Sequence, residues 1–125
     1  MTSVVTNLVN MVASSYVGNP PMMNQHSMRV VKLKTLKNFW ELEPTAKTGL
    51  QLWYRKITGQ RWETPNEIII NFTGADTVGN NRIVFNINRN DYRLIVTFRY
   101  KIQVCYVQFI GTHKAYDKID DVSLI

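Results

Sequence analysis

The sequence predicts an α+β fold in which helices cover one face of a small antiparallel sheet. Apolar and polar residues alternate through residues 82–87, 92–100 and 104–112, which is the period of half-buried strands. Polar turn residues interrupt these runs, as in the Asn-Arg-Asn-Asp stretch at 88–91. Upstream, apolar residues recur at helical spacing instead. We therefore expect a three-strand meander plus an N-terminal strand, with two or three helices packed on one face.

A strand and two helices are expected ahead of the meander. Residues 29–33 alternate weakly and are assigned to the N-terminal strand. Thr35 is placed to cap a first helix and Thr45 to cap a second. Pro44 separates them, because the residue before a proline disfavours helix. Gly59 stands where a glycine commonly ends a helix.

A third, short helix is predicted to begin at Thr64. This threonine is followed by Pro65 and Glu67, which is the pattern of a capping residue, a proline in the first turn and a reciprocal acid. The three isoleucines at 68–70 favour a strand, but the start signal is specific and we choose the helix. Residues 74–81 are expected to be a polar loop that leads into the sheet.

The register of the first hairpin places polar side chains on one face of the sheet. If Ile87 pairs with Tyr92, then Asn86 lies opposite Arg93. Because side chains alternate between faces, Arg82 then shares the face of Arg93. A slip of one residue would turn a strand over, so this geometry depends on the register.

The second hairpin adds a histidine to the same region. If Tyr100 pairs with Val104, Arg93 lies opposite Gly111, and His113 continues along that strand on a diagonal from Arg93. Diagonal neighbours are about 7–8 Å apart, within reach of long side chains. The opposite face should carry the core, formed by Ile83, Phe85, Ile87, Leu94, Val96, Phe98, Tyr106 and Ile110.

Length and charge bound the possible functions. At 125 residues the chain is one domain. Residues 1–27 contain no charged residue, so we expect a loose or partly helical extension there and a functional domain over 28–125. The net charge of +6 suggests an anionic partner, although a merely basic surface fits equally well. No apolar run approaches the roughly 18 residues that span a bilayer, so no membrane association is expected.

Metal and thiol chemistry are both disfavoured. The chain has only two histidines and one cysteine, so no metal-binding cluster is expected. A disulfide within the chain is impossible, and Cys105 is expected to pack in the core. Cys105 and His113 are eight residues apart on one strand, about 27 Å, which is too far for a nucleophile and its base.

The remaining candidates suit the cleavage of RNA without a metal. That reaction needs a base for the 2′-hydroxyl, an acid for the leaving 5′-oxygen and cations for the charge on the phosphate. Histidine in general suits proton transfer, and arginine matches phosphate oxygens with a planar fork. From the residues alone, a solvated sheet face and an ordinary strand end explain these positions better than catalysis does.

The sequence motifs shift that balance. The segments GNNRIVFNI, NDYRLIV and FIGTHKAYDKID closely resemble the HigB-type toxins of bacterial toxin–antitoxin pairs, a branch of the RelE/ParE-like superfamily. TLKNFWE, LQLWYRKI and TPNE also resemble this family and occur in the right order. The resemblance extends from Met28 to about Val122, and THKAYDKID is its most specific part.

This resemblance implies a function and a set of partners. It implies a cytoplasmic mRNA endonuclease that needs no cofactor and acts on messages in the ribosome. It also implies a HigA-like antitoxin with a helix-turn-helix fold, which neutralises the toxin and represses the shared operon, so that DNA is contacted only through the antitoxin.

The resemblance also implies roles for particular residues. Arg93 matches the phosphate-stabilising arginine, and Arg82 matches a basic position at the sheet edge. His113 and Tyr116 match the region of proton transfer, with Asp117 orienting one of them. The RNA-binding residues expected around them are Asn81, Asn86, Arg99, Lys101 and Lys114.

One departure from the family pattern and the breadth of the superfamily leave an alternative open. Several members of the superfamily have lysine or arginine where this chain has Val84 and His113, so the division between acid and base does not transfer. The superfamily also includes gyrase poisons. The alternative is therefore a non-catalytic member that binds RNA or gyrase.

Overall fold

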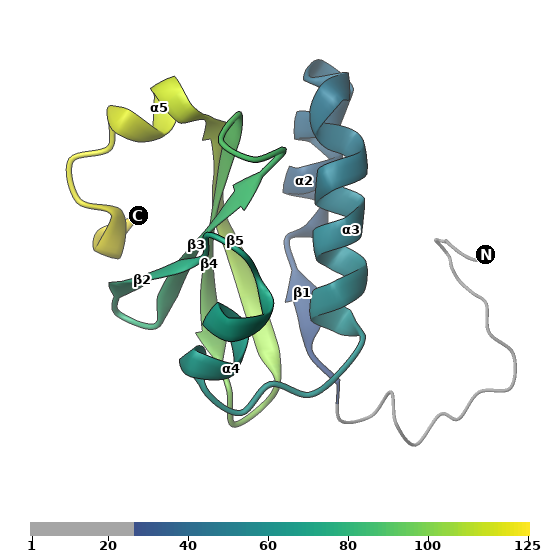
Figure 1. Ribbon diagram of the computed structural model, residues 1–125, viewed down its shortest axis with the longest axis vertical. Helices are drawn as coiled ribbons and strands as arrows, with labels where there is room; N and C mark the ends of the chain where they lie inside the picture. The colour runs from purple at the N-terminus through teal and green to yellow at the C-terminus, as the bar shows by residue number, and fades with distance from the viewer. Residues whose placement is uncertain (1–26) are drawn as a thin grey trace, which may run out of the picture.

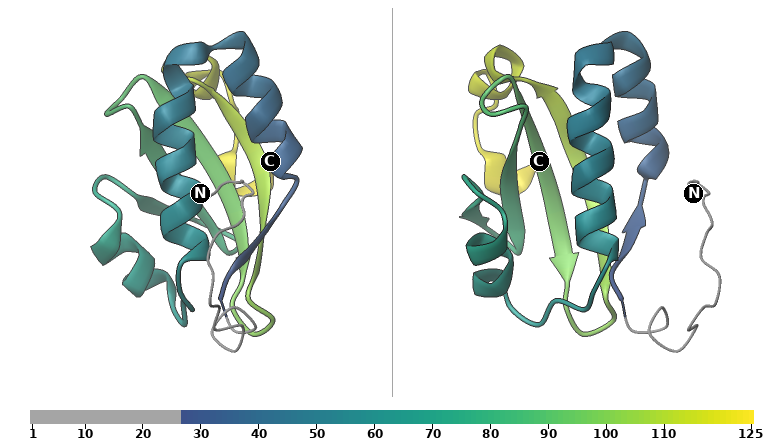
Figure 2. Two further views of the ribbon diagram at one scale, coloured as in Figure 1. Left: turned by 90° about the vertical axis from the view of Figure 1, so that its right-hand side faces the viewer. Right: turned by 45° about the vertical axis from the view of Figure 1, so that its right-hand side comes forward.

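Residues 27–125 are described by a computed structural model with a five-stranded sheet between two covering layers (Figure 1). Helices α2 and α3 lie side by side along one face, and the C-terminal segment lies on the other (Figure 2). The strand order is β1-β5-β4-β3-β2. The strands are β1 (Arg29–Val31), β2 (Asp76–Gly79), β3 (Arg82–Ile87), β4 (Tyr92–Arg99) and β5 (Val104–Thr112).

The helices confirm the predicted α+β class. The long helices α2 and α3 are amphipathic, and their apolar stripes meet the sheet. Among residues 27–125, no helix combines the length and the apolar composition needed to cross a bilayer. The helical segments are α2 (Leu33–Leu42), η1 (Pro44–Ala46), α3 (Lys47–Thr58), α4 (Pro65–Asn71), α5 (His113–Asp117) and η2 (Val122–Leu124).

The sheet has one strand more than expected, and it is mixed rather than purely antiparallel. Strand β1 pairs in parallel with β5, whereas the other pairings are antiparallel. Strand β2 occupies part of residues 74–81, which were expected to be a loop. Asn80 and Asn81 both have positive φ angles, as a two-residue hairpin turn requires. The strand is mostly exposed, so no apolar alternation announces it.

Two of the three predicted helix caps are wrong. Helix α2 begins at Leu33 after Lys32, which adopts the left-handed conformation, so Thr35 lies within the first turn. Thr45 belongs to the short 3₁₀ turn η1, where its hydroxyl hydrogen-bonds that of Tyr92. The third prediction is confirmed, because the Thr64 hydroxyl accepts a hydrogen bond from the Glu67 N–H at 3.3 Å. Gly59 ends α3 as predicted.

The first hairpin has the predicted register, with Ile87 opposite Tyr92 and Asn86 opposite Arg93. The second hairpin differs at its turn, where Val104 lies opposite Arg99 instead of Tyr100. A β-bulge at Gln108 inserts one extra residue into β5.

The bulge has opposite effects on its two sides. Beyond it the expected pairing returns, and Arg93 lies opposite Gly111. Before the bulge, the side chains of β5 point to the faces opposite to those predicted. Tyr106 therefore aligns with Thr97 on the face away from the helices. Cys105 and Val107 take the core positions instead. The placement of Cys105 in the core is therefore confirmed, whereas that of Tyr106 is wrong.

Candidate active site

Helix α5 begins directly where β5 ends, at the end of the sheet where Arg93 lies on the neighbouring strand β4. The Thr112 hydroxyl accepts a hydrogen bond from the Ala115 N–H at 3.1 Å and so caps the helix. The His113 N–H donates to the Asp91 carbonyl at 3.1 Å, which ties α5 to the turn between β3 and β4. His113 therefore opens a helix, and the expectation that it continues the strand is wrong.

The helical conformation brings His113 and Asp117 together. Positions four apart in a helix share a face, and the His113 Nδ1 lies 3.0 Å from the Asp117 Oδ2. The side chains are 42% and 58% exposed, so both are open to a ligand. A carboxylate that accepts from Nδ1–H leaves Nε2 free to accept a proton.

Arg93 lies against the same helix. Its guanidinium carbon is 5.2 Å from the centre of the Tyr116 ring, in a cation–π contact. Its Nη2 donates to the Asn90 Oδ1 at 3.2 Å. Its Nε is buried and has no hydrogen-bond partner among residues 27–125. The guanidinium is thus held in place while its buried Nε stays without a partner in the described part of the chain.

Asn86 is the cross-strand neighbour of Arg93 and has a similar unpaired atom. Its Oδ1 is buried without a partner in the described part of the chain. A side-chain carbon on Gly74 would lie 2.5 Å from the Asn86 Nδ2, so only glycine lets the loop pack this closely. Lys114 is exposed on α5. The structure therefore gathers Arg93, Asn86, His113, Lys114, Tyr116 and Asp117 at one end of the sheet.

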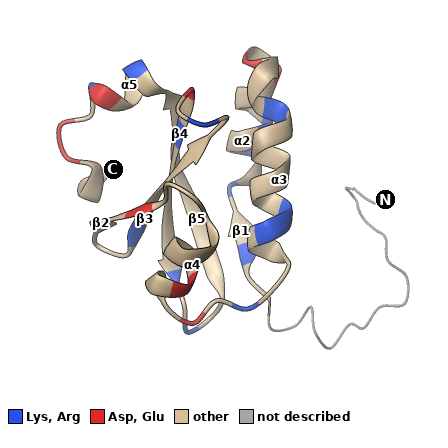
Figure 3. Cartoon of the chain, viewed as in Figure 1, with Lys and Arg blue, Asp and Glu red and all other residues tan. Residues whose placement is uncertain are grey.

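The other predicted site residues lie elsewhere. Arg82 shares a face with Arg93, as predicted, but it pairs with Thr97, about 13 Å further along the sheet. Arg99 and Lys101 are exposed at the far end of β4, with Arg99 about 20 Å from Arg93. Figure 3 likewise shows basic residues distributed over several elements rather than in one patch.

Asn81 is held within the turn between β2 and β3. Its carbonyl accepts a hydrogen bond from the Phe98 N–H at 2.8 Å.

Two residues of the site were missed by sequence reasoning. Asn90 was assigned only to a turn, yet its side chain holds Arg93, and Thr112 was assigned only to a strand, yet it caps α5. The signal for Thr112 was available, because a threonine ahead of a short polar segment is a common helix start. Nowhere in residues 27–125 do three His, Cys, Asp or Glu side chains group as metal ligands.

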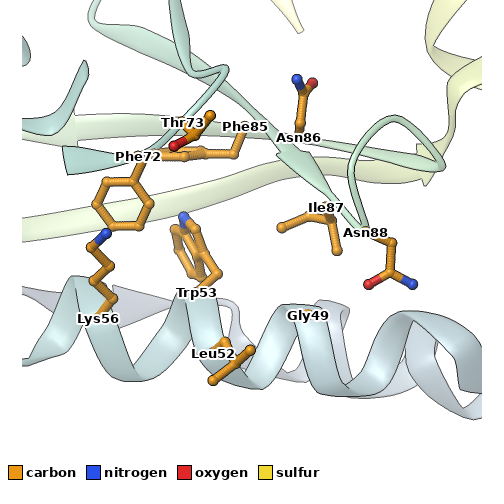
Figure 4. Close-up of a pocket in the computed structure, with 10 residues that line it drawn as sticks. All are labelled: Gly49, Leu52, Trp53, Lys56, Phe72, Thr73, Phe85, Asn86, Ile87 and Asn88. Atoms are coloured by element: carbon orange, nitrogen blue, oxygen red, sulfur yellow. The ribbon is translucent and has the colours of Figure 1, made fainter. Parts of the chain in front are cut away.

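A separate cleft of about 210 Å³ lies between α3 and β3, on the helix side of the sheet (Figure 4). Trp53 is buried there, and its Nε1 has no hydrogen-bond partner in the described chain. The Lys56 ammonium lies 4.6 Å from the centre of the Phe72 ring. Asn86 points away from this cleft, toward the face of Arg93 (Figure 4). The cleft and the candidate active site thus lie on opposite faces of the sheet and meet at Asn86, which also lines the cleft.

Known proteins resemble this chain in sequence. A family model described as HigB_toxin, a RelE-like toxic component of a toxin–antitoxin system, matches residues 46–119. This is more than half of the chain and includes all ten site residues predicted from the sequence. The chain therefore belongs to the HigB toxin family, as its motifs predicted.

Individual relatives agree with the family model. The chain is similar to the mRNA interferase toxin HigB of Escherichia coli (strain K12), with 28% identity over 92 residues, covering 72% of this chain and 88% of the relative. The proteins named mRNA interferase HigB of Escherichia coli O157:H7 and Shigella flexneri match with the same identity and coverage.

Proposed function

We propose that this protein is the toxin of a toxin–antitoxin pair and an endoribonuclease that cleaves mRNA without a metal ion. In this reaction the 2′-hydroxyl oxygen attacks the adjacent phosphorus, and its proton passes to a base. The bond from phosphorus to the 5′-oxygen breaks, and an acid protonates that oxygen. The products are a 2′,3′-cyclic phosphate and a 5′-hydroxyl end. The similarity to proteins named mRNA interferase supports the substrate class.

The unused Nε of Arg93 is the observation on which the mechanism rests. A buried guanidinium donor without a partner is costly unless a ligand supplies the acceptor. A phosphate oxygen is a suitable acceptor, because charge-assisted hydrogen bonds from arginine to phosphate are strong. The stacking on Tyr116 and the bond to Asn90 fix the fork before the substrate arrives. Arg93 would then stabilise the charge that develops on the phosphate.

The groups on α5 supply the proton transfers in this proposal. His113 accepts or donates through Nε2 while Asp117 holds Nδ1. The Tyr116 ring lies over Arg93, so its hydroxyl belongs to the same site and is the second candidate for proton transfer. Lys114 adds attraction for the RNA backbone.

The partners follow from the family and from the proposed reaction. A toxic component of a toxin–antitoxin system implies a cognate antitoxin. We propose that this antitoxin is a HigA-like helix-turn-helix protein, that DNA is contacted only through it, and that the toxin acts in the cytoplasm on messages held by the ribosome.

Substitution of Arg93 and His113 tests the reaction. Arg93→Ala and His113→Ala should each lower the cleavage rate by about 10²–10⁴-fold, because each removes a group that acts in the transition state. Both chains should stay folded by circular dichroism, since neither side chain belongs to the core. Arg55→Ala, which removes an exposed charge from α3, is the matched control and should cleave normally.

The readout is the mapping of message ends by primer extension, with and without ribosomes and with a chelator present. Cuts that require ribosomes and persist in the chelator support the proposal. Full activity in both variants would refute the residue roles. DNA damage signalling without RNA cuts would point to a gyrase-binding protein instead.

A further inference from the structure

The segment after α5 turns back across the sheet and reaches the hairpin between β2 and β3 (Figure 1). We name residues 118–125 the C-terminal strap. Within it, the Asp121 carboxylate accepts hydrogen bonds from the Ser123 N–H at 3.0 Å and the Ser123 hydroxyl at 2.7 Å. These bonds shape η2, so the strap has a defined conformation of its own.

The far end of the strap is fixed by two residues of the hairpin. The Asn80 Nδ2 donates to the Ser123 carbonyl at 2.9 Å. Arg82 donates to the Ile125 main-chain oxygen from Nε at 3.1 Å and from Nη2 at 2.8 Å. Its Nη1 donates to the Asn80 carbonyl at 3.0 Å. All three nitrogens of this guanidinium are therefore engaged by main-chain oxygens.

The strap lies over a face of the sheet that is buried although no long helix covers it. By alternation, Val84 and Ile95 point away from α2 and α3, and they are 4% and 0% exposed. Neither belongs to the core cluster beneath the helices. The strap lies on this side of the sheet (Figure 1), where its bonds to Asn80 and Arg82 hold it.

Helix α5 needs support at both of its ends. It has five residues, none of them buried, and a helix this short is unstable in isolation. Its start is held by Thr112 and by the bond from His113 to Asp91. Its end continues directly into the strap, whose next firm attachment is to Asn80 and Arg82.

We propose that Arg82 is a positioning residue, which anchors the strap and thereby holds α5, with His113, Tyr116 and Asp117, against Arg93. This proposal rests on the proposed function for its effect on cleavage, but its structural part does not. It also gives Arg82 a role other than phosphate binding, because each of its three nitrogens already donates to a main-chain oxygen and it lies about 13 Å from Arg93 along the sheet.

A double-variant experiment separates the two roles. Arg82→Ala and a chain that ends at Asp120 should each lower kcat by about tenfold with little change in KM, since both release the end of α5. Combined, they should lose no more than either one alone, because both remove the same attachment. Arg55→Ala is again the control.

The contrary results are equally specific. If Arg82 contacted a phosphate, Arg82→Ala would raise KM and would reduce the salt dependence of RNA binding by about one ion. The substitution would have the same effect in the chain that ends at Asp120. An increase in cleavage after removal of residues 121–125 would make the strap an inhibitor. Either result would overturn the positioning role.

Hydrogen exchange tests the anchor without any RNA. The amides of Lys118 and Ile119 are bonded to the carbonyls of Ala115 and Tyr116. These amides should exchange at least tenfold faster in Arg82→Ala and in the chain ending at Asp120, while the β3–β4 amides stay protected. Unchanged exchange would refute the anchor. Faster exchange in a protein that cleaves no RNA would refute only the proposed function.

Discussion

Cys105 shows how burial of one ionisable side chain can make the stability of the fold depend on pH. It lies beneath the helices and is 0% exposed, and this burial raises the pKa of its thiol from 9.0 to about 12. Burial, together with the neighbouring Cys105, also raises the pKa of Tyr100 from 10.0 to about 12. In both cases the folded protein holds the proton more tightly than the unfolded chain does.

The free energy of unfolding should therefore fall in alkaline solution. The contribution of Cys105 is complete below pH 9, and it is lost as the pH rises from 9 toward 12, where the unfolded thiol ionises first. Urea titrations between pH 7 and 11 should show this decline. Cys105→Ala should be less stable at pH 7 but should decline less between pH 9 and 10, before Tyr100 contributes. An equal slope in both proteins would contradict the assignment.

At the residue scale, the sequence predicted a pairing within one hairpin but not a contact between distant segments. The pairing of Asn86 with Arg93 follows from turn length and alternation, and it is confirmed. The engagement of Arg82 by Ile125 could not be predicted, because it joins residues 43 positions apart through a main-chain oxygen. No local pattern records such a contact.

At the scale of elements, the turn between β4 and β5 is held by a buried polar side chain. Gln103 is 4% exposed and has a positive φ of 55°. Its Nε2 donates to the carbonyls of Trp62 and Tyr100 at 2.7 Å each, and its Oε1 accepts from the Trp62 N–H at 3.0 Å. This side chain joins the turn to the segment between α3 and α4.

Loss of that side chain should destabilise the fold. Gln103→Ala leaves buried main-chain groups of Trp62 without partners, which costs about 1–3 kcal/mol. Gln108→Ala is a suitable control, because that side chain makes a single hydrogen bond, to Thr97. Urea unfolding at pH 7 measures both. A Gln103→Ala chain as stable as the control would show that water satisfies the freed groups.

Sequence patterns predicted elements where the local signal agreed with the packing. The Thr64 cap and the meander strands were found, because capping chemistry and alternation are local. The start of α2 was missed, since Lys32 adopts a left-handed conformation that its type rarely takes. His113 was assigned to the strand because the apolar alternation of β5 leads straight into α5.

At the scale of the molecule, Met28 joins the first described strand to the core. Met28 is 1% exposed, and its N–H donates to the Gln60 carbonyl at 3.1 Å. The next residues form β1, which pairs with β5. The expected extension at residues 1–27 lies almost entirely outside the described residues, so the domain boundary stays a prediction.

Truncation tests this boundary. In urea titrations, a chain that begins at Met28 should have the same free energy of unfolding as the full chain, within about 0.5 kcal/mol. The reason is that it retains the buried methionine and β1. A chain that begins at Leu33 lacks both and should be destabilised by several kcal/mol or fail to fold. If the chain beginning at Met28 fails to fold, the domain extends into residues 1–27.

The bulge at Gln108 separates two demands on a single strand. Toward Val104, β5 must meet a tight turn and deliver Cys105 to the interior. Toward Thr112, it must pair with β4 beside Arg93 and lead into α5. With one supernumerary residue between them, each half keeps the register that its own neighbours require. Deletion of Gln108 should shift one half by a residue, which either turns Cys105 out of the interior or separates Gly111 from Arg93.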